Sequence, residues 1–337
     1  MHLRTIGPSL ALVALVALVA LAVAAAPAPA TAMVPDGLEV TGWILQGGSN
    51  RLVERNADGI TTLSVAAVAL APDGGGVTAP GRDHERLRKA AHRHGLAAEL
   101  LVSNYSNRLG DFEPRRLHRL LANPKRIVRV ARRLAGFAAQ GWDGINIDLE
   151  RVRARDGDGL VTLAEQLGAR LPDEKTVSID VSAATSRRAY RDRGYRLARL
   201  AAAVDVIDLM TYDLHGPTWS GPGPIGDLDW QRRALEALLA VVPPGQVQLG
   251  VAGYGYTWPR EGTGRSVTVR QARRLVERSG ATAHWRPGPG EWTARLPDGT
   301  RMWWSDGRSY RRRVALAREY GVRGLAVWRL GSADPLT

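Results

Sequence analysis

Apolar and polar residues alternate along the chain in two regular ways. Short runs rich in Val, Ile, Leu and Ala recur between longer stretches whose apolar residues are spaced three or four apart. The short runs predict strands, and the longer stretches predict helices. Strands are predicted at residues 38–45, 60–70, 96–103, 141–150, 177–182, 204–212, 247–256 and 322–328. Helices are predicted at residues 83–94, 114–140 (interrupted near Asn123-Pro124), 157–171, 195–203, 228–241, 266–279 and 307–320.

The fourth predicted strand has polar residues on one face only. Ile145, Ile147 and Leu149 alternate there with Asn146, Asp148 and Glu150. Side chains on a strand point alternately to opposite faces, so the three polar residues share one face. A strand covered by helices on both faces would instead be apolar throughout. A (β/α)8 barrel accommodates the polar face, because the C-terminal ends of its strands carry the active site.

Strands that alternate with helices predict an α/β protein with a parallel sheet. Eight strands favour closure into a TIM barrel, although the pattern alone also allows an open, doubly wound sheet. Residues 257–321 are too many for one loop and one helix, so a small α+β insertion is predicted at about residues 260–306, with a hairpin turning at residues 297–299. Only nine residues follow Trp328, so a full eighth helix is not expected.

The first 32 residues differ in composition from the rest. An early Arg4, an apolar run at residues 10–25 and the small residues 30–32 predict a secretory signal peptide. A membrane anchor is the alternative, but the apolar run is shorter than the roughly 20 residues that span a bilayer. Residues 36–337 are then predicted to form the catalytic barrel. Cysteine is absent, so no disulfide stabilises it.

The chain carries a formal net charge of +13. This charge is compatible with electrostatic association with an anionic cell wall, and equally with a solvated, arginine-rich surface. No nucleic-acid module is recognisable, so no nucleic-acid partner is expected. No metal-binding motif is present, so no cofactor is expected, and a monomer is expected. Half of the 20 aromatic residues are Trp, whose flat face and N–H suit a sugar ring.

Four segments contain motifs that occur together in one enzyme family. Asp143, Gly144, Asp148 and Glu150 match a D-G-x-x-x-D-x-E signature, and residues 208–213, 253–258 and 324–331 match three later strand ends. In this order they resemble glycoside hydrolase family 18, the chitinase-like enzymes. Asn146 stands where most chitinases have Asp, and this variant resembles the spore-germination and cortex-lytic N-acetylglucosaminidases. The resemblance implies a TIM barrel.

The resemblance also implies roles for the residues at the strand ends. Glu150 is expected to be the general acid, because a pocket that removes it from water raises its pKa. Asp148 is expected to accept the N–H of the substrate's acetamido group and so align the acetamido oxygen with the anomeric carbon. Tyr212 would donate to the acetamido carbonyl, Asp213 would contact the sugar, and Trp328 would form the floor beneath it.

Other residues are expected to support this site. Asn146 is expected to hold Asp148 by hydrogen bonds and to contact substrate, whereas Asp143 is expected to fix the loop that enters the strand. Candidates for stacking on sugar rings are Tyr105, Trp219, Trp258 and Trp303. The predicted function is that of an exported, retaining glycosidase acting on β-1,4-linked N-acetylglucosamine glycans, with peptidoglycan favoured. Chitin is the second substrate, and a carbohydrate-binding barrel without turnover is the alternative of another class.

Overall fold

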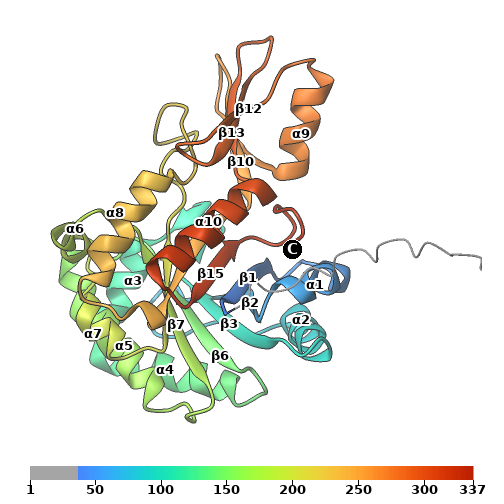
Figure 1. Cartoon of the computed structure of the whole chain (residues 1–337). Helices are drawn as coiled ribbons and strands as arrows, with labels where there is room; N and C mark the ends of the chain where they lie inside the picture. The colour runs from blue at the N-terminus through green and yellow to red at the C-terminus, as the bar shows by residue number, and fades with distance from the viewer. Residues whose placement is uncertain (1–36, 337) are drawn as a thin grey trace, which may run out of the picture. The chain divides into compact units, whose positions relative to one another are not determined.

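The computed structural model describes residues 37–336, whose centre is a closed barrel of parallel strands (Figure 1). The strands follow each other around the barrel in the order β1-β15-β9-β8-β7-β6-β3-β2. They are β1 Glu39–Leu45, β2 Thr62–Ala69, β3 Ala97–Ser103, β6 Gly144–Asp148, β7 Thr176–Ser182, β8 Val206–Met210, β9 Val247–Ala252 and β15 Gly324–Trp328. Because β1 pairs with β15, the TIM barrel is confirmed and the open sheet is excluded.

Helices surround this barrel. They are α1 Asn50–Asn56, α2 Arg82–Arg93, α3 Pro114–Leu121, α4 Pro124–Ala138, α5 Gly157–Gly168, α6 Arg187–Asp192, α7 Leu197–Ala201, α8 Leu228–Leu239 and α10 Gly307–Tyr320. The predicted interruption separates α3 from α4, where the Asn123 side chain accepts from the Arg126 backbone N–H and Pro124 occupies the first turn. Helix α6 was not predicted, because Tyr190 is the only buried residue in it and leaves no apolar periodicity.

The alternating pattern of β6 separates the outer core from the barrel interior. Ile145 and Ile147 are fully buried in the main hydrophobic core. Asn146 instead contacts Trp43 of β1, three strands away around the barrel, and Asp180 of the neighbouring strand β7. The polar face of this strand therefore points into the barrel, as the sequence predicts.

The insertion begins earlier than predicted. The expected seventh strand at residues 247–256 is two strands, because β9 ends at Ala252 and β10 (Tyr254–Trp258) belongs to a separate antiparallel sheet. This sheet has the order β11-β10-β14-β13-β12, in which the other strands are β11 Ser266–Thr268, β12 His284–Arg286, β13 Glu291–Arg295 and β14 Arg301–Trp304. Helix α9 (Val269–Arg278) accompanies it, and the predicted hairpin is confirmed as β13 and β14.

Gly253 lies between these two strands. A Cβ atom at this position would lie 2.4 Å from the Cβ of Ala333, so only glycine allows the close approach of the C-terminal segment. Hydrophobicity is continuous across the break, and the pattern therefore could not reveal it.

The C-terminal segment takes the place of an eighth helix in the described part of the chain. After β15, the Leu330 N–H donates to the Trp43 carbonyl (2.9 Å), and the Leu336 N–H donates to the Asn56 side chain (3.0 Å). Leu336 is buried against the main core. The predicted signal peptide at residues 1–32 lies outside the described residues. Within residues 37–336, no helix has the length and apolar character needed to cross a membrane.

Candidate active site

Two cavities open where the barrel strands end. One of about 800 Å³ is lined by Tyr105, Asp148 and Trp328, among others. The other, of about 380 Å³, is lined by Glu150 and Tyr212. Each of the two signature carboxyls therefore lines one cavity, Asp148 the larger and Glu150 the smaller.

Glu150 lies just beyond the end of β6, and hydrogen bonds to its backbone hold it in place. Its N–H donates to the side-chain oxygen of Asn104 (2.8 Å), and the Asn104 amide donates to its carbonyl (3.0 Å). Asn104 is fully buried and directly follows β3. Sequence reasoning missed it, although its place one residue after a predicted strand was a usable signal.

The surroundings of Glu150 favour its protonated form. Burial raises the pKa of this carboxyl well above its usual range, and the nearby Asp148 and Asp213 raise it further. A raised pKa shifts this carboxyl toward its protonated form. The side chain is therefore suited to donate a proton to a leaving group.

Asp148 is the last residue of β6 and is almost completely buried. Burial raises its pKa to about 7, and the neighbouring Ser103 hydroxyl acts in the opposite direction. One carboxyl oxygen, Oδ1, is buried without a hydrogen-bond partner. Such an atom is costly unless a ligand supplies the missing donor.

Asn146 differs from its prediction. Its amide nitrogen donates to Ser178 Oγ and Asp180 Oδ1 (both 2.9 Å), and its oxygen accepts from the Trp43 indole (3.3 Å). The expected hydrogen bond to Asp148 does not form, because residues two apart on a strand lie roughly 6.6 Å apart while adjacent strands are about 4.8 Å apart. Asn146 has no exposed surface and lines neither cavity, so the expected contact with substrate is also not seen.

Two further buried carboxyls lie below the signature pair. Burial raises the pKa of both Asp180 and Asp208 well above the usual range; Asp148 and Asp208 add to the effect at Asp180, and Glu99 adds to it at Asp208. Asn146 donates to both, at 2.9 Å and 3.4 Å. Asp180 was not singled out from the sequence. The alternation of polar and apolar residues along β7 was the same signal that marked β6.

Replacing Asn146 with Asp is expected to make folding stability fall more steeply with pH. The new carboxyl would lie beside Asp180 and Asp208, so its own pKa should also be raised. A carboxyl with a raised folded-state pKa binds more protons when folded, so stability is lost as pH rises above the unfolded value of about 3.9. Thermal melts of both proteins from about pH 4.5 to about pH 8 measure this effect. Parallel melting curves at every pH would contradict the coupling.

Tyr212 and Asp213 follow β8, beside the insertion. Asp213 Oδ1 accepts hydrogen bonds from the hydroxyls of Tyr254 (2.5 Å) and Tyr256 (2.8 Å), both on β10. Asp213 has φ 59°, in the left-handed region that is unfavourable for most side chains. Burial raises the pKa of Tyr212 well above its usual range, so its hydroxyl stays a hydrogen-bond donor. The insertion therefore fixes the position of Asp213, the residue that follows Tyr212.

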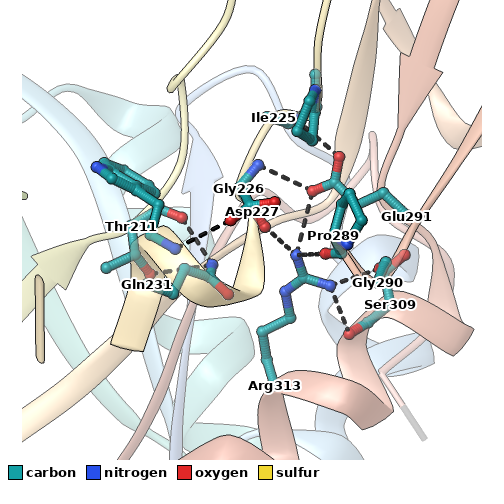
Figure 2. A network of polar contacts seen from close by, with 12 residues as sticks. Thr211, Ile225, Gly226, Asp227, Gln231, Pro289, Gly290, Glu291, Ser309 and Arg313 are labelled. Carbon is teal, nitrogen blue, oxygen red and sulfur yellow. Dashed lines mark hydrogen bonds and ion pairs between the residues drawn. The ribbon is translucent and has the colours of Figure 1, made fainter. Parts of the chain in front are cut away.

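A buried ion pair holds the loop that follows Asp213 (Figure 2). Glu291 of β13 accepts from the backbone N–H groups of Ile225 (2.7 Å) and Gly226 (2.9 Å). Arg313 of α10 lies 3.2 Å from the same carboxylate, and both side chains are about 1% exposed. Insertion, helix and loop are thus joined by one charged pair.

Some of the predicted aromatic residues line a cavity or are exposed, whereas Trp258 is buried. Trp328 and Tyr105 both line the larger cavity, and Tyr105 is 41% exposed. Trp219 is 53% exposed and packs edge-on against Tyr256. Trp258 does not fit its prediction as a stacking residue, because it is buried and its indole donates to the Ser220 carbonyl.

Trp303 and Asp143 complete the set of predicted residues. Trp303 is half-buried and packs in the cluster of Tyr254 and Tyr256. Asp143 accepts from the Ala98 backbone N–H (2.8 Å) at the start of β6, which confirms its structural role. Among residues 37–336, no group of three or more His, Cys, Asp or Glu side chains is placed to hold a metal ion.

Comparison with known proteins places this site in a family. The model of glycosyl hydrolases family 18 matches residues 61–333. The chain belongs to glycosyl hydrolases family 18. It is therefore a glycosidase, related to spore cortex-lytic enzymes and chitinases.

Several relatives show how far this likeness extends. The chain is 29% identical to the glycosylase YdhD of Bacillus subtilis over 66% of its length and 55% of that protein. It is 25% identical to the cortical fragment-lytic enzyme of Bacillus subtilis over 74% of its length and 60% of the relative. The structure of a chitinase from Chromobacterium violaceum superposes with a TM-score of 0.79 and 25% identity, covering 89% of this chain and 96% of that one. The chain thus spans little more than half the length of these two Bacillus relatives, but nearly all of the chitinase.

Proposed function

We propose that this family 18 glycosidase is exported and cleaves β-1,4-linked N-acetylglucosamine glycans with retention of configuration, by substrate-assisted catalysis. One observation carries the proposal. Glu150, whose pKa is raised by burial, lines one cavity, and Asp148, which lines the other, has a buried carboxyl oxygen without a hydrogen-bond partner. The alternative of a carbohydrate-binding barrel without turnover lacks a reason to keep an acid of raised pKa at this position.

The geometry supports the following sequence of steps. Glu150 donates its proton to the glycosidic oxygen, and the leaving sugar departs. Asp148 accepts the N–H of the acetamido group, whose oxygen attacks the anomeric carbon and forms an oxazolinium intermediate. Glu150, now a carboxylate, takes a proton from water as the water opens this ring. Two inversions at the same carbon give net retention. Tyr212 would donate to the acetamido oxygen, and Trp328 would support the sugar ring.

Peptidoglycan is the proposed substrate, with chitin as the second candidate. A relative with 25% identity is a cortical fragment-lytic enzyme, which favours the cell-wall polymer. The likeness to a solved chitinase favours chitin. Product analysis on purified peptidoglycan and chitin, side by side, decides between them. Release of reducing ends from chitin alone would contradict the proposal.

The 2-acetamido group of the substrate is expected to be required for turnover. Without the acetamido oxygen there is no internal nucleophile, so the oxazolinium intermediate that Asp148 helps to align cannot form. Hydrolysis of an N-acetylated glycan and its de-N-acetylated form is measured under the same conditions, and a thiazoline that mimics the intermediate should inhibit. If the free amine is hydrolysed as fast as the acetamide, the substrate-assisted mechanism is wrong.

A further inference from the structure

Helices α3 and α4 concentrate positive charge outside the active site. Between Pro114 and Ala138 the chain has no Asp or Glu. The same segment contains the basic residues Arg115, Arg116, Arg119, Lys125, Arg126, Arg129, Arg132 and Arg133. Surface helices usually mix both signs of charge, since oppositely charged neighbours stabilise them. This segment is therefore an unusual surface even in a basic protein.

Three exposed arginines of α4 carry part of this charge. Arg129, Arg132 and Arg133 are three or four residues apart, so their guanidinium groups lie on one side of the helix and repel each other. All three are exposed, and none belongs to an ion pair within residues 37–336. Such an arrangement costs stability unless an anion binds to it.

A groove lies along these arginines. It has a volume of about 700 Å³ and runs between α4 and the segment of residues 69–78. Arg116, whose Nε is buried without a hydrogen-bond partner, also lines it. Two carboxylates lie nearby: Asp73, which accepts from the Gly75 backbone N–H and whose pKa is lowered by that bond and by the charges of Arg126 and Arg129, and Glu113, which pairs with Arg116. The groove is therefore a cationic surface with an apolar wall.

The groove adjoins the larger active-site cavity. Ala69, the last residue of β2, lines both. An extended peptide spans about 3.4 Å per residue, so a short branch on a glycan in the cavity can reach across this residue. Guanidinium groups bind carboxylates through paired hydrogen bonds.

We infer that the groove of Arg116, Arg129, Arg132 and Arg133 binds carboxylate-bearing peptide branches of the glycan in the active site. This rests on the proposed function and deepens it, because chitin carries no such branches. The groove would then select charged over neutral glycans.

The test uses a variant in which Arg129, Arg132 and Arg133 are all replaced with Gln. KM and kcat are measured on peptidoglycan fragments with intact peptide branches and on the same fragments after the branches are removed. KM for the branched glycan is expected to rise on the order of tenfold at low salt, with kcat little changed. The difference should shrink at high salt, where exposed charges are screened. KM for the stripped glycan should not change.

A charge-matched control removes three arginines elsewhere. Arg270, Arg274 and Arg278 lie on one side of α9 and are exposed, and their replacement with Gln removes the same net charge. The control should behave like wild type. An equal rise in KM in the control, or an equal rise on stripped glycan, overturns the inference. The inference is also overturned if a phosphate-rich wall polymer competes with the branched glycan for binding and free branch peptides do not.

A binding measurement separates this inference from the proposed function. The Glu150→Gln protein, with and without the three arginine replacements, is sedimented with branched and with stripped glycan. If wild type hydrolyses neither polymer but the arginines still favour the branched one, the function is wrong and the groove stands. If binding is the same for both glycans, the groove is wrong whatever the activity.

Discussion

Glu150→Gln is expected to lower kcat by at least about 10²–10⁴-fold while glycan binding is retained. The amide has nearly the shape of the carboxylic acid but cannot transfer a proton to the glycosidic oxygen. It also cannot act as the base that activates water in the second step. Release of reducing ends from peptidoglycan measures the loss, and co-sedimentation of the protein with the polymer measures binding.

A control variant and a measurement of folding stability make this result interpretable. Glu174→Gln removes an exposed carboxyl just before β7, at the opposite end of the barrel, and should leave activity unchanged. Because the folded-state pKa of Glu150 is raised, its ionisation destabilises the fold as pH rises. The melting temperature of Glu150→Gln should therefore fall less than that of wild type between about pH 5 and about pH 8. Equal turnover by variant and wild type would remove Glu150 as the acid, whereas binding without turnover by wild type would favour the carbohydrate-binding alternative.

Arg313→Ala is expected to lower the free energy of unfolding by about 3–5 kcal/mol. The change leaves the Glu291 carboxylate buried without its countercharge, and the carbonyls of Gly226, Pro289 and Gly290 lose a donor. Urea unfolding measures the loss. Arg312→Ala, one residue earlier on the same helix and exposed, should change stability by less than about 0.5 kcal/mol.

A second variant tests whether the charge is the cause. Glu291→Gln combined with Arg313→Met removes both charges, and it should recover part of the stability lost in Arg313→Ala. The loop anchored by Glu291 follows Asp213, so kcat should fall in Arg313→Ala even where the protein remains folded. Full stability and full activity in Arg313→Ala would show that the buried pair does not hold this loop.

The sequence by itself determined the eight strands and the position of the signature carboxyls, and the family motifs chose the barrel over an open sheet. The strand pattern depends on which face of the strand each side chain points to. This is a local property, and the alternation of apolar and polar residues shows it directly. The side chains of Asn146 and Asp148 point inward as predicted, and α10 has the predicted ends. Proline and an asparagine cap likewise placed the break between α3 and α4, because their effects act within one turn.

The tertiary structure alone decided which groups meet across the barrel. Alternation shows that Asn146 faces inward, but its partners Asp180 and Asp208 lie on the next two strands, and the register that brings them to Asn146 is contained in no local pattern. The same holds for Asn104, which directly follows β3 and accepts from the Glu150 backbone N–H, 46 residues further along the chain. The prediction that Trp258 stacks on a sugar does not fit for a related reason. In the sequence, an aromatic residue at a strand end has the same pattern whether its ring is exposed or buried. The burial of a side chain and its hydrogen-bond partners are properties of the packed barrel. The pKa values of the carboxyls in the site depend on both.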